Sequence, residues 1–141
     1  MLDWNRRVEI AQAAVDRFCG YPVAMGERDC VRLAAFVLRA AGYPVSLVKA
    51  GSYSTLRGAR RALTRAGFAT LAEAVDAQGL TRIAPAARWP ADIIAMPAEA
   101  DDPFGCSLAV ALTNGRILGL HHETGGFALG QPTEFLTAWR L

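Results

Sequence analysis

The spacing of apolar positions changes near residue 80 of this chain. Before that point apolar residues recur every three or four positions, as in amphipathic helices; after it they form short runs between proline and glycine, as in strands. The first predicted helix begins after Asp3, a favourable N-cap, and continues to about Arg17. Its expected apolar stripe consists of Trp4, Val8, Ala11 and Val15.

The second predicted helix is apolar around nearly its whole circumference. Asp29 precedes it as a cap, residues 31–41 are mostly apolar, and Gly42 follows as a stop signal. Such a helix belongs at the centre of a fold. Two shorter helices are expected over Thr55–Ala66 and over Thr70–Gly79, the latter opened by a capping box. The inward positions expected for the third helix are Leu56, Ala59 and Leu63.

Short apolar runs after residue 80 predict strands. The runs are Asp92–Met96, Ser107–Leu112, Arg116–Leu120 and a final segment, Phe135–Leu141. Asn114-Gly115 lies between two of them, and Asn-Gly is the strongest short signal for a hairpin. The stretch framed by Pro85 and Pro90 has the composition of a linker.

This order of elements predicts an α+β fold in which helices come first and a strand meander follows. We expect one domain over residues 1–141, mainly helical over 1–80 and mainly β over 81–141. A small antiparallel sheet or half-barrel then packs against the helix that carries Cys30.

Composition narrows the functional classes. Apolar residues make up 52% of the 141 residues. No uninterrupted apolar run reaches the roughly 18 residues of a membrane-spanning helix. Residues 1–7 do not resemble a signal peptide. The net charge of +2 is too small to predict a nucleic-acid partner. Three cysteines without a C-x-x-C pair argue against a zinc site or a disulfide framework. Neither a metal nor another cofactor is therefore expected.

One face of the third predicted helix is basic. It consists of Arg57, Arg60, Arg61 and Arg65. Two interpretations stay open: a contact with nucleic acid or an acidic partner, or a solvated face, which is the commoner case.

Cys30 is the main candidate for chemistry because it stands at the start of the buried helix. Backbone N–H groups and the helix dipole favour a thiolate there, which is the form that attacks an amide carbonyl. The alternative is a small buried cysteine kept for packing. His121 and His122 are the only histidines in the sequence. They could be bases for this thiol, metal ligands or pH-sensitive contacts, or simply exposed residues at a polar hairpin end, and we favour the last interpretation.

Four short segments, in this order, carry a family resemblance. They are Gly26-x-x-Asp29-Cys30, Gly51-x-Tyr53-Ser54-x-x-x-Gly58-Ala59, Pro90-Ala91-Asp92-Ile93-Ile94 and Ala138-Trp139-Arg140-Leu141. Together they resemble the NlpC/P60 papain-like proteins, and more closely a phage-encoded branch, DUF6950, found among tail-assembly and tail-tip genes. The resemblance spans most of the chain and implies a papain-like fold and a role in virion tails.

The resemblance also implies where a catalytic base would lie. NlpC/P60 enzymes usually place a histidine at the start of the strand that precedes the hairpin. Counting back from Asn114-Gly115, this position falls at about Ser107, beside Cys106, and neither is a general base at neutral pH. Cys30 thus occupies the position of the nucleophile without its expected partner, which indicates a scaffold that has lost its activity.

Two functions follow as expectations. The first is a structural or assembly component of a siphovirus-like tail tip or baseplate, made in the bacterial host's cytoplasm, located in the virion and bound to other tail-tip or baseplate proteins. The second is a cysteine peptidase that cleaves peptidoglycan cross-links during genome delivery; it needs an imidazole within about 3 Å of Cys30 or one water away. We expect the first.

Overall fold

A computed structural model describes residues 2–45, 53–99, 102, 104–121 and 123–141. Its helices are α1 (Trp4–Phe18), α2 (Cys30–Ala40), α3 (Leu56–Arg65), α4 (Leu71–Asp76) and two 3-10 turns, η1 (Pro85–Ala87) and η2 (Thr113–Gly115). The predicted caps Asp3, Asp29 and Thr70 are confirmed, because each side chain accepts a backbone N–H from the first turn of its helix. Thr55 caps α3 in the same way. Local capping chemistry therefore sets where the helices begin.

The strands form one antiparallel sheet in the described part of the chain. They are β1 (Thr81–Ile83), β2 (Ile93–Met96), β3 (Ser107–Ala111), β4 (Ile117–His121), β5 (Gly126–Gly130) and β6 (Thr137–Arg140). Their order across the sheet is β1-β6-β2-β3-β4-β5. The last strand is therefore an interior one, with Trp139 paired to Arg82 of β1 on one side and to Ile93 of β2 on the other. The fold is α+β, as predicted.

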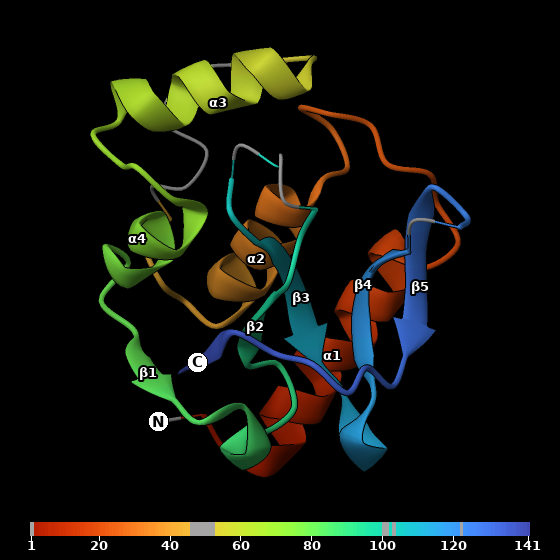
Figure 1. The fold of residues 1–141 in the computed structure, drawn as a ribbon. Coiled ribbons are helices and arrows are strands. Elements are labelled where there is room, and N and C mark those ends of the chain that lie inside the picture. Colours follow the sequence, from red (N-terminus) through yellow and green to blue (C-terminus); the bar gives the residue numbers. More distant parts are fainter. Residues whose placement is uncertain (1, 46–52, 100–101, 103, 122) are drawn as a thin grey trace.

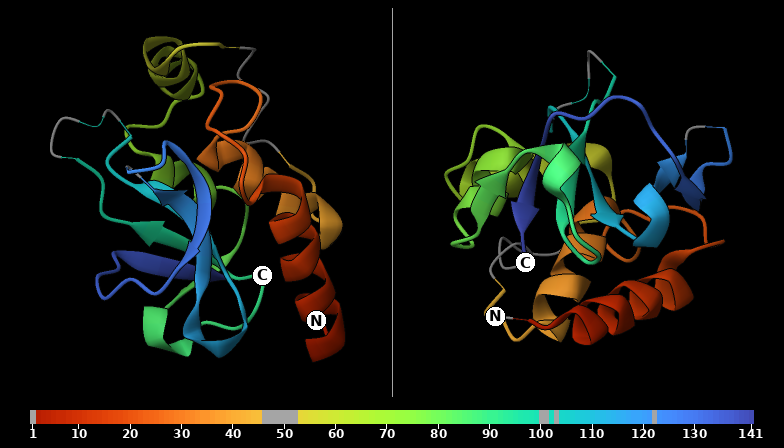
Figure 2. Two further views of the ribbon diagram at one scale, coloured as in Figure 1. Left: turned by 90° about the vertical axis from the view of Figure 1, so that its right-hand side faces the viewer. Right: turned by 90° about the horizontal axis from the view of Figure 1, so that it is seen from below.

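Helices α1 and α2 lie on one face of the sheet, with α3 and α4 towards one end of the molecule (Figures 1 and 2). The strand residues that face α2 are fully buried and large or branched, including Ile93, Leu108, Val110, Leu118 and Trp139. The alternate residues form a second, smaller cluster on the other face. It consists of Ile94, Ala109, Ala111, Ile117 and Ala138, with Ile83, Met96 and Phe135 packed against it. The central position of α2 agrees with its all-round apolar sequence.

Two of the predicted inward faces are wrong in part. In α1 the buried side chains are Arg7, Ile10, Ala11, Ala14 and Phe18. Trp4, expected in the stripe, is 55% exposed. In α3, Leu56 is 45% exposed and Ala62 is buried in its place. The α1 face differs from the prediction because a charged residue, Arg7, belongs to it.

The segment after residue 80 is more ordered than its composition indicated. The stretch interpreted as a linker contains η1, directly after the edge strand β1. The sequence analysis also missed β5. This strand pairs antiparallel with β4, so that Gly130 lies opposite Ile117 and Gly126 lies opposite His121. Glycine and alanine supply three of its five residues, so it lacks the β-branched pattern that marks strands in a sequence.

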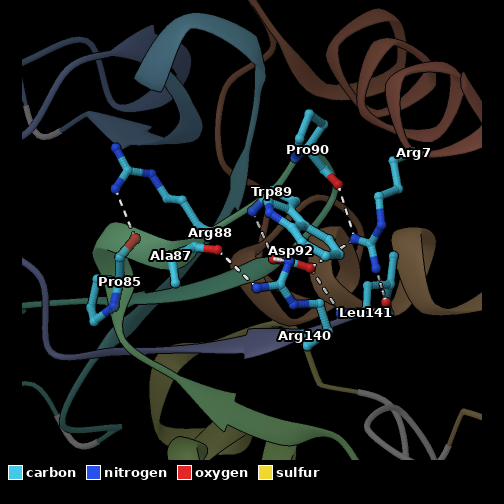
Figure 3. Close-up of polar contacts among 9 residues, drawn as sticks. All are labelled: Arg7, Pro85, Ala87, Arg88, Trp89, Pro90, Asp92, Arg140 and Leu141. Atoms are coloured by element: carbon cyan, nitrogen blue, oxygen red, sulfur yellow. Dashed lines mark hydrogen bonds and ion pairs between the residues drawn. The ribbon is translucent and has the colours of Figure 1, made fainter. Parts of the chain in front are cut away.

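A buried ion pair joins α1 to the sheet (Figure 3). The guanidinium of Arg7 donates to Oδ1 of Asp92 at 2.9 Å, and both side chains are at most 1% exposed. Oδ1 also accepts the backbone N–H of Leu141 at 2.9 Å, while Oδ2 accepts that of Trp89 at 2.8 Å and pairs with Arg140 at 3.2 Å. The carboxylate thus has a partner on each side, which offsets the cost of removing it from water.

We predict that Asp92→Asn lowers the free energy of unfolding by about 3 kcal/mol, because it leaves Arg7 buried without a counter-charge. Urea denaturation followed by circular dichroism measures the loss. Glu9→Gln is the matched control, since Glu9 pairs with Arg6 on the surface, where both side chains are about half exposed or more; its loss is expected to stay below about 1 kcal/mol. Equal losses in the two variants would contradict the role assigned to Asp92.

Candidate functional site

The start of α2 is organised by the carboxylate of Asp29, which is only 2% exposed. Oδ1 accepts the backbone N–H of Arg32 at 2.9 Å, the N-cap bond. Oδ2 accepts the backbone N–H of Gly26 at 2.9 Å and the hydroxyl of Tyr53 at 3.1 Å. One side chain therefore fixes the helix start, the preceding turn and the segment that leads to α3.

Tyr53 closes over this cap. Its hydroxyl accepts from the guanidinium of Arg32 at 2.6 Å, and the same guanidinium lies 4.6 Å from the centre of its ring. Burial, followed by the neighbouring Asp29 carboxylate, raises the pKa of Tyr53, so the phenol stays protonated and keeps donating. Gly26 has φ +86° and lies so close to the backbone of Tyr53 that a Cβ would fall 1.7 Å from its carbonyl oxygen. A glycine is therefore required at residue 26.

Cys30 is the first residue of α2 and is 6% exposed. The backbone of Leu108 and the hydroxyl of Ser107, both on β3, lie close enough to its sulfur to lower the pKa of the thiol. Burial nevertheless dominates and raises the pKa of the Cys30 thiol to about 12, with Asp29 and Cys106 adding in the same direction. The thiolate expected from the position at a helix start is therefore not favoured, because desolvation outweighs the backbone donors.

The structure brings together two of the residues singled out from the sequence, Cys30 and Ser107. His121 lies at the exposed end of β4, with its ring against Gly130, and is not among the groups that act on the Cys30 sulfur. His122 lies outside the described residues. Within the described part of the chain, no imidazole faces this thiol.

A groove of about 630 Å³ lies on the sheet face away from α2. Ser107, Ala109, Gly119 and His121 are among its lining residues, and Cys30 is not. The serine thus lies between the sulfur and the groove. Because burial raises the pKa of Cys30, the thiolate form that attacks a carbonyl is disfavoured at neutral pH in this conformation.

Other chemistry can be surveyed over the same described residues. They contain no group of three potential metal ligands, and no helix among them is long and apolar enough to cross a membrane. Cys19, Cys30 and Cys106 are all free thiols. The sequence prediction did not anticipate Tyr53 as a partner of Asp29, although the Gly26-x-x-Asp29 spacing was a local signal for the turn that they hold.

Comparison with protein families gives one match, to a domain of unknown function, DUF6950, over residues 1–141. The chain belongs to the DUF6950 family. Comparison with curated proteins gives no match. The DUF6950 membership anticipated from the four segments is thus confirmed over the whole chain.

We predict that Asp29→Ala lowers the free energy of unfolding by about 3 kcal/mol, because it removes the cap of α2 and leaves buried donors of Gly26 and Tyr53 unpaired. Thr55→Ala is the control. It removes an N-cap bond alone, to Gly58, and should cost about 1 kcal/mol. A loss no larger for Asp29→Ala than for Thr55→Ala in urea denaturation would show that the extra contacts contribute nothing.

We predict that Cys19, which is half-buried, reacts with an aromatic disulfide reagent before Cys30. In the folded state the pKa of the Cys30 thiol is raised to about 12. Raising the pH from 7 to 9 should therefore leave its labelling slow, whereas an ordinary thiol with a pKa of about 8.5 becomes mostly thiolate over that range. Mass spectrometry of the labelled chain, with and without urea, measures each site. Rapid labelling of folded Cys30 at pH 7 would contradict this picture.

Proposed function

We propose that this protein is a structural or assembly component of a phage tail tip or baseplate, built on an NlpC/P60-like scaffold that does not catalyse. The observation that carries the non-catalytic part is the Cys30 thiol, which is buried, has a pKa raised to about 12 and lies beside Ser107. The tail assignment draws on the resemblance of its segments to tail-tip and tail-assembly proteins. Its partners are then neighbouring tail proteins, and its location is the virion.

The geometry around Cys30 supports the proposed kinship in one respect. A thiol begins a central helix, and the start of the strand before the Asn114-Gly115 turn lies against it. This is the arrangement in which papain-like enzymes hold a nucleophile and a base. Here the strand presents the hydroxyl of Ser107, which can orient a thiol but cannot take its proton at neutral pH.

The alternative, a cysteine peptidase acting on peptidoglycan, requires a base within reach of the sulfur and an open path to it. Neither condition is met by the described residues, because the thiol is buried and the nearest polar side chain on β3 is Ser107. We therefore place this activity second.

We predict that the purified chain releases no muropeptides from peptidoglycan, since burial keeps its thiol protonated and no imidazole among the described residues faces it. Chromatography of the soluble products measures the release, with Cys30→Ala as the matched variant and an active NlpC/P60 enzyme as the positive control. Release by the natural chain that disappears in Cys30→Ala would overturn the proposal that the scaffold is inactive.

The tail assignment has its own test in particles from a phage or prophage that encodes the chain. Mass spectrometry of purified virions should detect the protein with the tail proteins, and deletion of its gene should give tail defects in electron micrographs. Normal, infectious particles from the deletion strain would contradict a structural or assembly role.

A further inference from the structure

Helix α3 concentrates positive charge in a way that the rest of the chain does not. Four arginines lie within its ten residues, and it contains no acidic residue. The whole chain has 15 basic and 13 acidic residues; without these four arginines, 11 basic residues face 13 acidic ones, a net charge of −2. The net positive charge of the chain is therefore due to this one helix.

Three of these arginines form a line along the exposed face of α3. We call Arg57, Arg61 and Arg65 the basic stripe; all three side chains are exposed. They are spaced four residues apart, so neighbours lie about 6 Å apart along the helix axis. None of the three forms a side-chain hydrogen bond or ion pair with any residue that the structure describes.

This arrangement is unfavourable for the isolated helix. Like charges four residues apart destabilise a helix by a few tenths of a kcal/mol per pair. The buried side of α3 is small, consisting of Ala59, Ala62 and Leu63. Other arginines of the chain, such as Arg7, Arg32 and Arg82, have carboxylate partners. An unneutralised line of arginines is explained if a partner supplies the missing carboxylates.

The position of α3 makes the stripe accessible. The helix lies across one end of the molecule, away from the sheet strands at the other end (Figures 1 and 2). Leu56, at the border of the stripe, is 45% exposed and adds apolar surface. Arginine beside an exposed apolar side chain is a composition enriched at protein interfaces.

We propose that the basic stripe of α3 docks an acidic protein surface, a helix or segment with carboxylates repeated at the same spacing. A nucleic acid is the less favoured polyanion, because a nucleic-acid-binding domain is expected to be strongly basic as a whole, whereas the net charge of this chain is only +2 and its remainder outside α3 is net acidic. A long polyanion would extend beyond α3 and be repelled by the net-acidic remainder of the chain. An acidic segment about as long as α3 would not extend that far. This docking does not depend on the state of Cys30.

The test uses the full chain and a fluorescent helical peptide with glutamate at every fourth position on one face. A peptide with glutamine at those positions serves as the uncharged probe, and duplex DNA serves as the competing polyanion. Fluorescence anisotropy at low salt and at physiological salt measures affinity. The acidic peptide should bind, more weakly as salt rises.

The triple variant Arg57→Gln, Arg61→Gln, Arg65→Gln should weaken binding of the acidic peptide about tenfold. The triple Arg→Lys variant at these positions keeps the charge and should stay within about threefold of the natural chain. A charge-matched control changes Arg17, Arg39 and Arg116 to glutamine. These arginines are also exposed, lie outside α3, and should not affect binding. The single variant Arg61→Gln, with circular dichroism, gives an intermediate effect in a chain shown to be folded.

Three results would overturn the proposal. One is an absence of acidic-peptide binding at low salt. Another is an equal loss in the stripe variant and in the charge-matched control, which would indicate non-specific attraction. The last is tighter binding of duplex DNA than of the peptide, with dependence on the stripe, which would assign the surface to nucleic acid. Because none of these readouts involves muropeptide release or the thiol, their failure is distinguishable from failure of the proposed function.

Discussion

The carboxylate of Asp92 determines how the two halves of the chain are held together. It is fully buried and binds Arg7 of α1, the backbone of Leu141 after β6 and the backbone of Trp89 before β2. In the sequence, Arg7 is 85 residues and Leu141 is 49 residues away from Asp92, whereas Trp89 is a local partner. A buried carboxylate with several hydrogen-bond partners tolerates little displacement of any of them. The position of α1 against the sheet is thus specified by charge as well as by packing.

Backbone hydrogen bonds next to Asp92 stabilise an otherwise unfavourable backbone conformation. Ala91, just before Asp92, has φ 73°, in the left-handed region, which costs a non-glycine residue about 1 kcal/mol or more. The Ala91 N–H bonds to the Ala111 carbonyl at 2.9 Å, and the Asp92 N–H bonds to that of Trp89 at 3.1 Å. Such a conformation persists where its surroundings over-determine it, and here the bonds on both sides of Ala91 do so.

How far the sequence predicted this structure depends on the range of the interactions. The helix starts, the buried α2 and the Asn114-Gly115 turn were predictable because caps and turns are set by residues close in sequence. The buried face of α1 was not, because Arg7 is placed inward by a partner 85 residues away. At the candidate site, counting back from the turn placed Ser107 at the strand start, where β3 does begin. The raised pKa of Cys30 was not predictable, since a helix start by itself favours the thiolate.

The burial of this thiol follows from the fold. A helix that is apolar on all sides must be covered on all sides, and α2 is covered by α1 and by the sheet (Figure 2). Cys30 is the first residue of α2, so the same packing excludes water from its thiol, with β3 on the opposite side. Ser107, at the start of β3, lies beside the thiol on that side and itself lines the groove. The packing that covers α2 is therefore what keeps this thiol protonated. A thiol whose proton is held by the fold is the physical reason for which we propose an assembly role and not catalysis.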